Sequence, residues 1–226
     1  MSADLSLMTT YGPQLIEGFR LTVLIWLSGS ALAVALGFVL GLILSVGGPA
    51  LTLPVRAYVE FFRGTPLLAQ LFLAYYGGPS IGITLDAVTV GVCGLGLYGA
   101  AYFAEIFRAG FASIPEGQLE AARSFGLSRR KRIRYIILPQ LLVLAVPASV
   151  NLLIILLKDT AILSIVTVPE LTFQVTGMTL ETFTFVAPFA ALAALYWALT
   201  ELVAFLGRRA ELRLGVYLRP EVRAAG

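Results

Sequence analysis

Five apolar stretches that hold no charged residue constrain the fold of this sequence more than any other feature. A helix needs about 20 apolar residues to cross the roughly 30 Å hydrocarbon core of a bilayer. The first stretch is long enough for one span and a turn at Gly47-Gly48-Pro49. The five stretches are Leu21–Val55, Gly64–Leu85, Ala87–Ala104, Tyr135–Leu157 and Thr182–Thr200. The pattern predicts an all-α integral membrane protein with about five transmembrane helices, in which residues 1–226 form a single domain.

A sixth apolar region, between the fourth and fifth stretches, is too short and too interrupted to span the bilayer. Thr160–Pro169 and Leu171–Leu180 are separated by Pro169 and Glu170. Irregular backbone at membrane depth is tolerated only within protein or beside a water-filled cavity. We therefore expect a short re-entrant or half helix here.

The composition excludes several classes of function. Hydrophobic residues make up 58% of the chain and charged residues 13%, about half the charged share of a soluble domain. The sequence has no histidine and one cysteine, Cys93. Histidine catalysis, a disulfide within the chain and a His/Cys metal site are therefore excluded. We predict no catalytic residue and no metal ligand.

The distribution of lysine and arginine predicts the orientation. With the N-terminus outside, the internal segments hold Arg56, Arg63, seven basic residues from Arg108 to Arg134 and five from Arg208 to Arg223, while the external segments hold Arg20 and Lys158. Basic residues concentrate on the cytoplasmic side. The asymmetry predicts an N-out, C-in topology. Within the spans, small residues such as Gly37 and Gly41 are expected where helices approach closely.

The long internal connection at residues 113–139 carries the clearest local signals. Ser113 and Glu116 form a predicted capping box for a helix over residues 114–126, which Gly126 ends with a left-handed cap. Ser128 is expected to cap a second, basic helix. A short capped helix between spans favours insertion into a groove of a partner protein. The alternative is an amphipathic helix on the lipid surface, where the basic residues attract anionic headgroups.

This connection resembles the EAA loop of ATP-binding-cassette importer permeases. The family pattern is E-A-A, three residues, G, nine residues, then I-x-L-P, and it is met by Glu120-Ala121-Ala122, Gly126 and Ile136-x-Leu138-Pro139. Four further stretches resemble the branch for polar amino acids such as histidine, glutamine, arginine, glutamate and opines. They begin at Glu60, Gly99, Ser113 and Leu157.

The resemblance implies a type I importer permease in a bacterial inner membrane, with the loop helix seated in a separate ATPase. The chain has no G-x-x-x-x-G-K-[ST], so ATP and Mg²⁺ are expected on that ATPase and no cofactor in this chain. The implied partners are two ATPase copies, a second permease copy or paralogue, an extracytoplasmic amino-acid-binding protein and membrane lipids, but no nucleic acid. The implied coupling residues are Glu116, Leu119, Glu120, Ala121, Ala122, Arg123 and Gly126.

Polar residues inside the spans are candidates for the substrate pathway, because polar groups at membrane depth are costly. A zwitterionic amino acid needs an acceptor for its ammonium and donors for its carboxylate, which helix N-termini also supply. The candidates are Gln70, Asn151, Lys158, Asp159, Thr160, Glu170 and Gln174. Lys158 and Asp159 have the alternative of pairing with each other at the outer interface. Spacing of (i, i+3) predicts ion pairs for Glu60 with Arg63 and Glu105 with Arg108.

Two other functions remain as alternatives. An ion-gradient-driven secondary transporter of small polar solutes normally carries an internal repeat, and five spans do not divide into equal halves. A membrane-embedded enzyme lacks a clustered nucleophile and base in this sequence.

Overall fold

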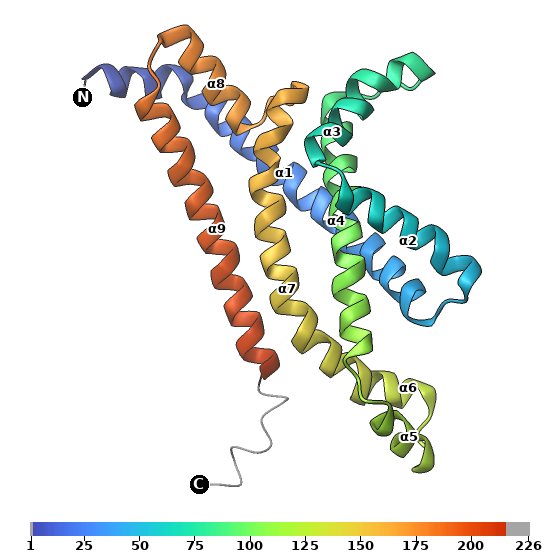
Figure 1. Ribbon diagram of the computed structural model, residues 1–226. Coiled ribbons are helices and arrows are strands. Elements are labelled where there is room, and N and C mark those ends of the chain that lie inside the picture. The colour runs from blue at the N-terminus through green and yellow to red at the C-terminus, as the bar shows by residue number, and fades with distance from the viewer. Residues whose placement is uncertain (1, 216–226) are drawn as a thin grey trace, which may run out of the picture.

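The computed structural model describes residues 2–215, and its helices are arranged around a long, tilted first helix (Figure 1). In chain order the α-helices are α1 (Ser2–Val46), α2 (Pro49–Gly64), α3 (Leu67–Phe72), α4 (Ala87–Ala112), α5 (Glu116–Ser124), α6 (Arg129–Arg132), α7 (Leu138–Asp159), α8 (Leu171–Thr182) and α9 (Val186–Gly215). Short π and 3-10 turns fill the gaps at η1 (Leu73–Gly77), η2 (Gly78–Ile81), η3 (Ile133–Ile137) and η4 (Thr160–Val166). Two of the basic residues that predict the orientation, Arg219 and Arg223, lie outside the described residues, and so does the C-terminus.

Four helical segments within the described residues are long and apolar enough to cross a membrane. They are Thr10–Val46, Ala87–Ala112, Arg129–Val166 and Val186–Leu214. Each contains or overlaps one of the predicted apolar stretches, so four of the five predicted spans are confirmed as continuous helices. The predicted interruption between the fourth and fifth stretches is confirmed as well, because η4 ends the segment that begins at Arg129 and α8, Leu171–Thr182, is a separate short helix.

The second predicted span, Gly64–Leu85, is wrong as a continuous helix. The chain instead forms α2, a break at Thr65-Pro66, then α3, η1 and η2. A residue before proline is pushed out of the helical region, and Thr65 is extended at φ −119° and ψ 145°. The proline therefore separates α2 from the apolar stretch, whose helical part is limited to α3, η1 and η2 because Gly82 at φ +82° ends it. Both α2 and α3 lie beside α4 (Figure 1).

Gln70 stabilises this break. Its Nε2 donates to the carbonyl oxygens of Phe62 at 3.1 Å and Thr65 at 3.2 Å, and to Thr65 Oγ1 at 2.7 Å. These carbonyls lost their helical partners when the helix ended, and leaving them unpaired away from water is costly. The Nε2 of Gln70 is thus bonded to the residues at the break, while among the described residues its buried Oε1 has no hydrogen-bond partner.

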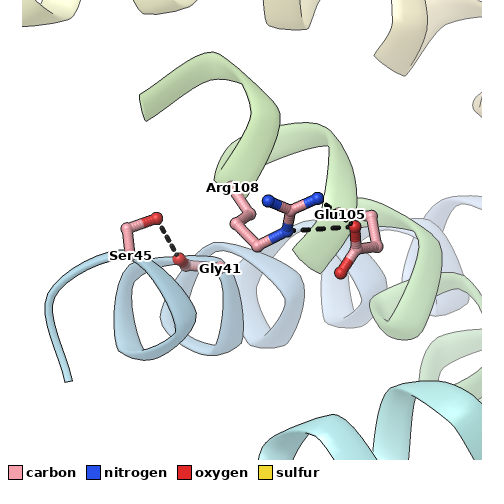
Figure 2. Close-up of polar contacts among 4 residues, drawn as sticks. All are labelled: Gly41, Ser45, Glu105 and Arg108. Carbon is pink, nitrogen blue, oxygen red and sulfur yellow. Dashed lines mark hydrogen bonds and ion pairs between the residues drawn. The ribbon is translucent and has the colours of Figure 1, made fainter. Parts of the chain in front are cut away.

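The tight crossing of α1 over α4 is the main packing contact of the fold. A Cβ on Gly41 would stand 2.8 Å from the carbonyl oxygen of Ala104 and 2.8 Å from Phe107 Cβ, closer than real Cβ atoms come. A Cβ on Gly37, one turn earlier, would collide with Phe103 Cβ and stand 3.0 Å from the Ala100 carbonyl oxygen. Figure 2 shows Gly41 on α1 beneath α4, with the Ser45 hydroxyl donating to the Gly41 carbonyl at 2.7 Å. The prediction that small residues permit close approach is confirmed here.

The start of α4 is fixed by Asp86, which caps the helix outside the membrane-spanning segment. Its carboxylate accepts from the backbone N–H of Thr89 at 2.9 Å and also from the Thr89 hydroxyl. These hydrogen bonds favour the ionised form and hold the pKa of Asp86 below its usual value. From this start α4 runs to the end of the bundle where α5 and α6 lie (Figure 1).

Candidate functional site

The connection between α4 and α7 forms a compact helical elbow at one end of the bundle (Figure 1). The predicted helix is present as α5, shorter than expected at Glu116–Ser124. The predicted capping box is wrong. Pro115 occupies the cap position without a side-chain hydrogen bond, and the Ser113 hydroxyl donates instead to the Gly110 carbonyl at 2.8 Å. Ser113 lies too close to the end of α4, whose free carbonyls take its hydroxyl.

The turn after α5 forms as predicted. Gly126 has φ +68°, in the left-handed region that favours glycine. The Leu127 N–H donates to the Ala122 carbonyl at 3.0 Å and the Gly126 N–H to the Arg123 carbonyl at 2.9 Å. These two bonds form a Schellman motif. Ser128 follows at the cap of α6, but its side chain makes no capping hydrogen bond.

One face of α5 packs on the protein and the other is exposed. Ala122 is buried and Leu119 is half-buried, so these two predicted coupling residues lie on the inner face. The Gln140 side chain of α7 donates from Nε2 to the side-chain Oε1 of Gln118 at 2.7 Å, which ties α5 to the next span. The inner face therefore holds α5 to the end of the bundle.

The outer face of α5 is an exposed stripe at helical spacing. Its members are three or four residues apart, which places them on one side of the helix. They are Gly117, Glu120, Ala121, Ser124 and Phe125, all exposed. Phe125 is an apolar ring that is 84% exposed, and it was not among the predicted coupling residues. We call these five residues the outer stripe.

The remaining predicted coupling residues are also exposed. Glu116 and Arg123 both lie open to the surroundings. Among the described residues, Arg123 forms no ion pair with Glu120 or with any other carboxylate. Glu116 and Glu120 likewise form no ion pair within the described residues.

The predicted pathway residues divide into an exposed set and a buried set. On α7, Asn151 and Lys158 are exposed and Asp159 is half-buried. Within the described part of the chain, no ion pair joins Lys158 to Asp159, so the alternative pairing is absent. The Gln174 side chain donates to the Pro169 carbonyl at 3.2 Å. The predicted role of these residues in the pathway stays a prediction.

Glu170 and Thr160 belong to a buried network that joins α1, α8, α9 and η4. Both residues are 0% exposed. The Glu170 carboxylate accepts from the Phe173 N–H at 2.9 Å, the Thr22 hydroxyl at 3.2 Å and the Tyr196 hydroxyl at 3.2 Å. The Tyr196 hydroxyl also lies 3.1 Å from Thr160 Oγ1. A solute does not reach either group in this conformation, so their geometry favours a structural role over pathway lining.

A polar cavity between α2 and α4 was missed by the sequence analysis. It has a volume of about 440 Å³, and its charged and polar lining comprises Arg56, Glu60, Arg63, Tyr102 and Glu105. We call it the α2–α4 cavity. Charged residues at three-residue spacing on two helices were visible in the sequence, but nothing in the sequence indicated that the two helices face each other.

The charges around this cavity are only partly paired. Arg108 holds Glu105 with two hydrogen bonds of 2.7 and 3.0 Å, as predicted (Figure 2). The predicted pair of Glu60 with Arg63 is wrong, because the Arg63 guanidinium instead lies 5.3 Å from the centre of the Tyr102 ring. Glu60 therefore has no ion-pair partner among the described residues. The cavity presents both signs of charge.

Comparisons with known proteins agree with this architecture. Residues 17–216 match the family described as binding-protein-dependent transport system inner membrane component. The chain is 37% identical over 196 residues to a probable amino-acid ABC transporter permease protein, YckA, of Bacillus subtilis (strain 168), covering 85% of each chain. It is 36% identical to the L-cystine transport system permease protein TcyL of the same organism, covering 93% of this chain and 91% of that protein.

Solved structures show the same fold. A crystal structure of an amino acid ABC transporter with histidines has a chain that superposes with a TM-score of 0.83, at 34% identity, covering 91% of this chain and 96% of that one. A chain of the MetNI methionine ABC transporter in an inward-facing conformation superposes with a TM-score of 0.74 at 22% identity, covering 89% of this chain and 96% of that one, and supports the fold alone. The chain belongs to the family of binding-protein-dependent transport system inner membrane components, and it is the membrane-spanning permease subunit of an ATP-driven importer.

Proposed function

We propose that this permease subunit forms part of the pathway for polar amino acids and that α5 transmits the movement of the ATPase to it. The support for the substrate class is that similar chains are named as permeases for amino acids, glutamine, arginine and cystine. The proposed assembly contains two ATPase copies that bind ATP and Mg²⁺, a second permease copy or paralogue, and an extracytoplasmic amino-acid-binding protein. The subunit works in a bacterial inner membrane.

The outer stripe of α5 is the observation that carries the coupling proposal. A helix that is held on one face and exposes an i, i+3, i+4, i+7 stripe on the other is suited to a groove in a partner. Phe125 supplies an apolar anchor, and Glu120 supplies a charge without an internal ion pair among the described residues. The Schellman turn at Gly126 sets the direction in which the chain leaves the groove.

The orientation follows from the basic residues. In the proposed topology, α5 and α6 lie in the cytoplasm, where an ATPase has access to ATP, and the N-terminus lies outside. Arg123 and the basic residues of α6 stand at this end of the bundle. An excess of lysine and arginine on cytoplasmic segments is the general rule for membrane proteins.

The α2–α4 cavity is the proposed place where the pathway contacts an amino acid. Arg56 and Arg63 suit the carboxylate of a zwitterion, and Glu60 suits its ammonium group. The attraction between these charges and a zwitterion is stronger inside a cavity than in bulk water, because the surrounding dielectric constant is lower. Among the predicted pathway residues, Asn151, Lys158, Asp159 and Gln174 remain as proposed contacts elsewhere along the route.

Co-purification tests the proposed coupling. The full-length chain is extracted from native membranes in mild detergent, and the proteins that accompany it are identified. Ala121→Arg places a bulky charge in the outer stripe. Ala210→Arg is the matched control, because Ala210 is an exposed alanine on α9, away from α5. We expect an ATPase to accompany the wild type and Ala210→Arg but not Ala121→Arg. Equal retention by both variants would refute docking through the outer stripe.

A further inference from the structure

A second cavity, larger than the α2–α4 cavity, opens where the ends of α1, α4 and α7 meet α5 and α6. Its volume is about 530 Å³. Nearly all of its wall is apolar, and the side chains that form it include Phe38 and Leu42 of α1, Phe111 of α4 and Leu138 and Leu141 of α7. Phe38 is 42% exposed and Leu42 is 39% exposed. Apolar surface of this kind is unfavourable in water, so an apolar occupant is expected.

Three arginines stand around this apolar wall. Arg123 extends from α5, and Arg129 and Arg132 extend from α6, while no acidic residue lines the cavity. Within the described part of the chain, none of the three guanidinium groups forms a hydrogen bond, an ion pair or a contact over an aromatic ring. Three guanidinium groups that line one cavity, without a carboxylate beside them, suit a phosphate group, which arginine binds through paired N–H donors.

We propose that this cavity binds one anionic phospholipid, with its acyl chains on the apolar wall and its phosphate on Arg123, Arg129 and Arg132. The combination of an apolar chamber and a cationic rim matches the two ends of a lipid. The cavity also lies at the end of the membrane-spanning helices, where headgroups meet water. Basic pockets between transmembrane helices at such a boundary are a known setting for anionic headgroups.

The lipid site and the proposed partner surface occupy different faces of α5. Leu119 and Arg123, one turn apart, line the cavity. Glu120, Ala121 and Ser124 of the outer stripe do not. A bound lipid therefore leaves the outer stripe accessible. It fills the space between α5 and the end of α1, which braces the elbow against the first span.

The basic sequence of α6 offers a matched pair of variants. Arg129→Gln/Arg132→Gln removes two charges that line the cavity, and Arg130→Gln/Lys131→Gln removes two charges of the same helix that do not. Both variants change the net charge equally. Leu42→Trp keeps every charge and fills part of the apolar wall, so it tests the chamber even if the arginine variant folds poorly.

Native mass spectrometry of the full-length chain, purified in mild detergent with the subunits that accompany it, counts bound lipids. The probes are dioleoyl phosphatidylglycerol, dioleoyl phosphatidylcholine and glycerol 3-phosphate. We expect one phosphatidylglycerol per chain in preference to phosphatidylcholine. Affinity should fall roughly 30-fold in Arg129→Gln/Arg132→Gln, since each basic residue attracts an anionic lipid by about a factor of five. It should also fall in Leu42→Trp and change little in Arg130→Gln/Lys131→Gln.

Three results would overturn the proposal. Equal losses in the two arginine and lysine variants would reduce the effect to general attraction between a basic helix and anionic lipid. Displacement of phosphatidylglycerol by glycerol 3-phosphate at similar concentrations would assign the site to a soluble phosphate compound. Phosphatidylcholine binding as strongly as phosphatidylglycerol would leave the arginines without a role. None of these results depends on whether α5 docks on an ATPase.

Discussion

At the scale of single residues, the sequence predicts best where backbone geometry alone decides the residue. Gly126 was predicted to end α5 in a left-handed cap, and it does so at φ +68°. Ser113 was predicted to cap α5 and instead bonds the end of α4. A serine between two helices can cap the start of the second helix or bond a free carbonyl at the end of the first. Which of the two forms depends on where the free carbonyls of the first helix lie. The sequence does not contain those positions.

Gly126 supports a graded prediction. Gly126→Val places a branched side chain at φ +68° and should cost about 1–2 kcal/mol in the turn, whereas Gly126→Asn should cost less. Nothing lies within 4 Å of the added Cβ, so backbone strain is the only cost. We expect ATPase retention to decline in the order wild type, Gly126→Asn, Gly126→Val. Equal retention by Val and Asn would show that the left-handed turn does not set the docking geometry.

Glu170 supports a second prediction at this scale. Glu170→Ala removes the cap of α8 and leaves the Thr22 and Tyr196 hydroxyls without their acceptor, which should cost about 1–3 kcal/mol. Glu170→Gln keeps an acceptor oxygen and should cost less. Thermal unfolding in detergent measures both, with the exposed Glu201→Ala as the control. If Glu170→Ala unfolds like the wild type but abolishes uptake, the residue acts on the substrate and the structural role is wrong.

At the scale of elements, hydropathy identifies the long helices but not how they are interrupted. The apolar stretch Gly64–Leu85 holds a local signal at each end, since Thr65 before Pro66 leaves the helical region and Gly82 adopts φ +82°, so the helical part between them is limited to Leu67–Ile81. Hydropathy averages over these local signals. The Gly37 and Gly41 pair did predict close packing, although the identity of the neighbour, α4, became visible only in the structure.

The α1–α4 crossing predicts a contrast between two glycines of α1. Gly41→Ala forces a Cβ against the Ala104 carbonyl and Phe107, each 2.8 Å away, and should cost about 1–3 kcal/mol. Gly12→Ala meets nothing within 4 Å and should be neutral or slightly stabilising, since alanine favours helix. Thermal unfolding in detergent measures the difference. A wild-type unfolding temperature for Gly41→Ala would contradict the close crossing.

At the scale of the whole molecule, the elbow was largely predictable and the α2–α4 cavity was not. The elbow is local in sequence, and its loop pattern resembles a known family. The cavity forms where Arg63 of α2 lies over the ring of Tyr102 of α4. The spacing of residues within each helix does not indicate that these two helices face each other. Glu170 and Thr160 illustrate the same difficulty, because burial by α1 and α9 decides whether a polar group faces a pathway.

The α2–α4 cavity predicts which charges matter for uptake. Arg63→Gln and Glu60→Gln each remove a charge that lines the cavity, and each should lower amino-acid uptake about tenfold or more through a loss of roughly 1.5–3 kcal/mol. Arg20→Gln, at an exposed position of α1 that does not line the cavity, is the control and should leave uptake unchanged. Uptake by reconstituted complexes gives the comparison. Full activity in both cavity variants would remove the cavity from the proposed pathway.

The most direct test of the central claim is uptake of labelled polar amino acids by proteoliposomes that contain the purified complex and its binding protein. We predict that uptake requires ATP on the side of α5, is unaffected by dissipating ion gradients, survives Ala210→Arg and is lost in Ala121→Arg. Uptake driven by an ion gradient without ATP, and equal in the two variants, would contradict the account and identify a secondary transporter instead.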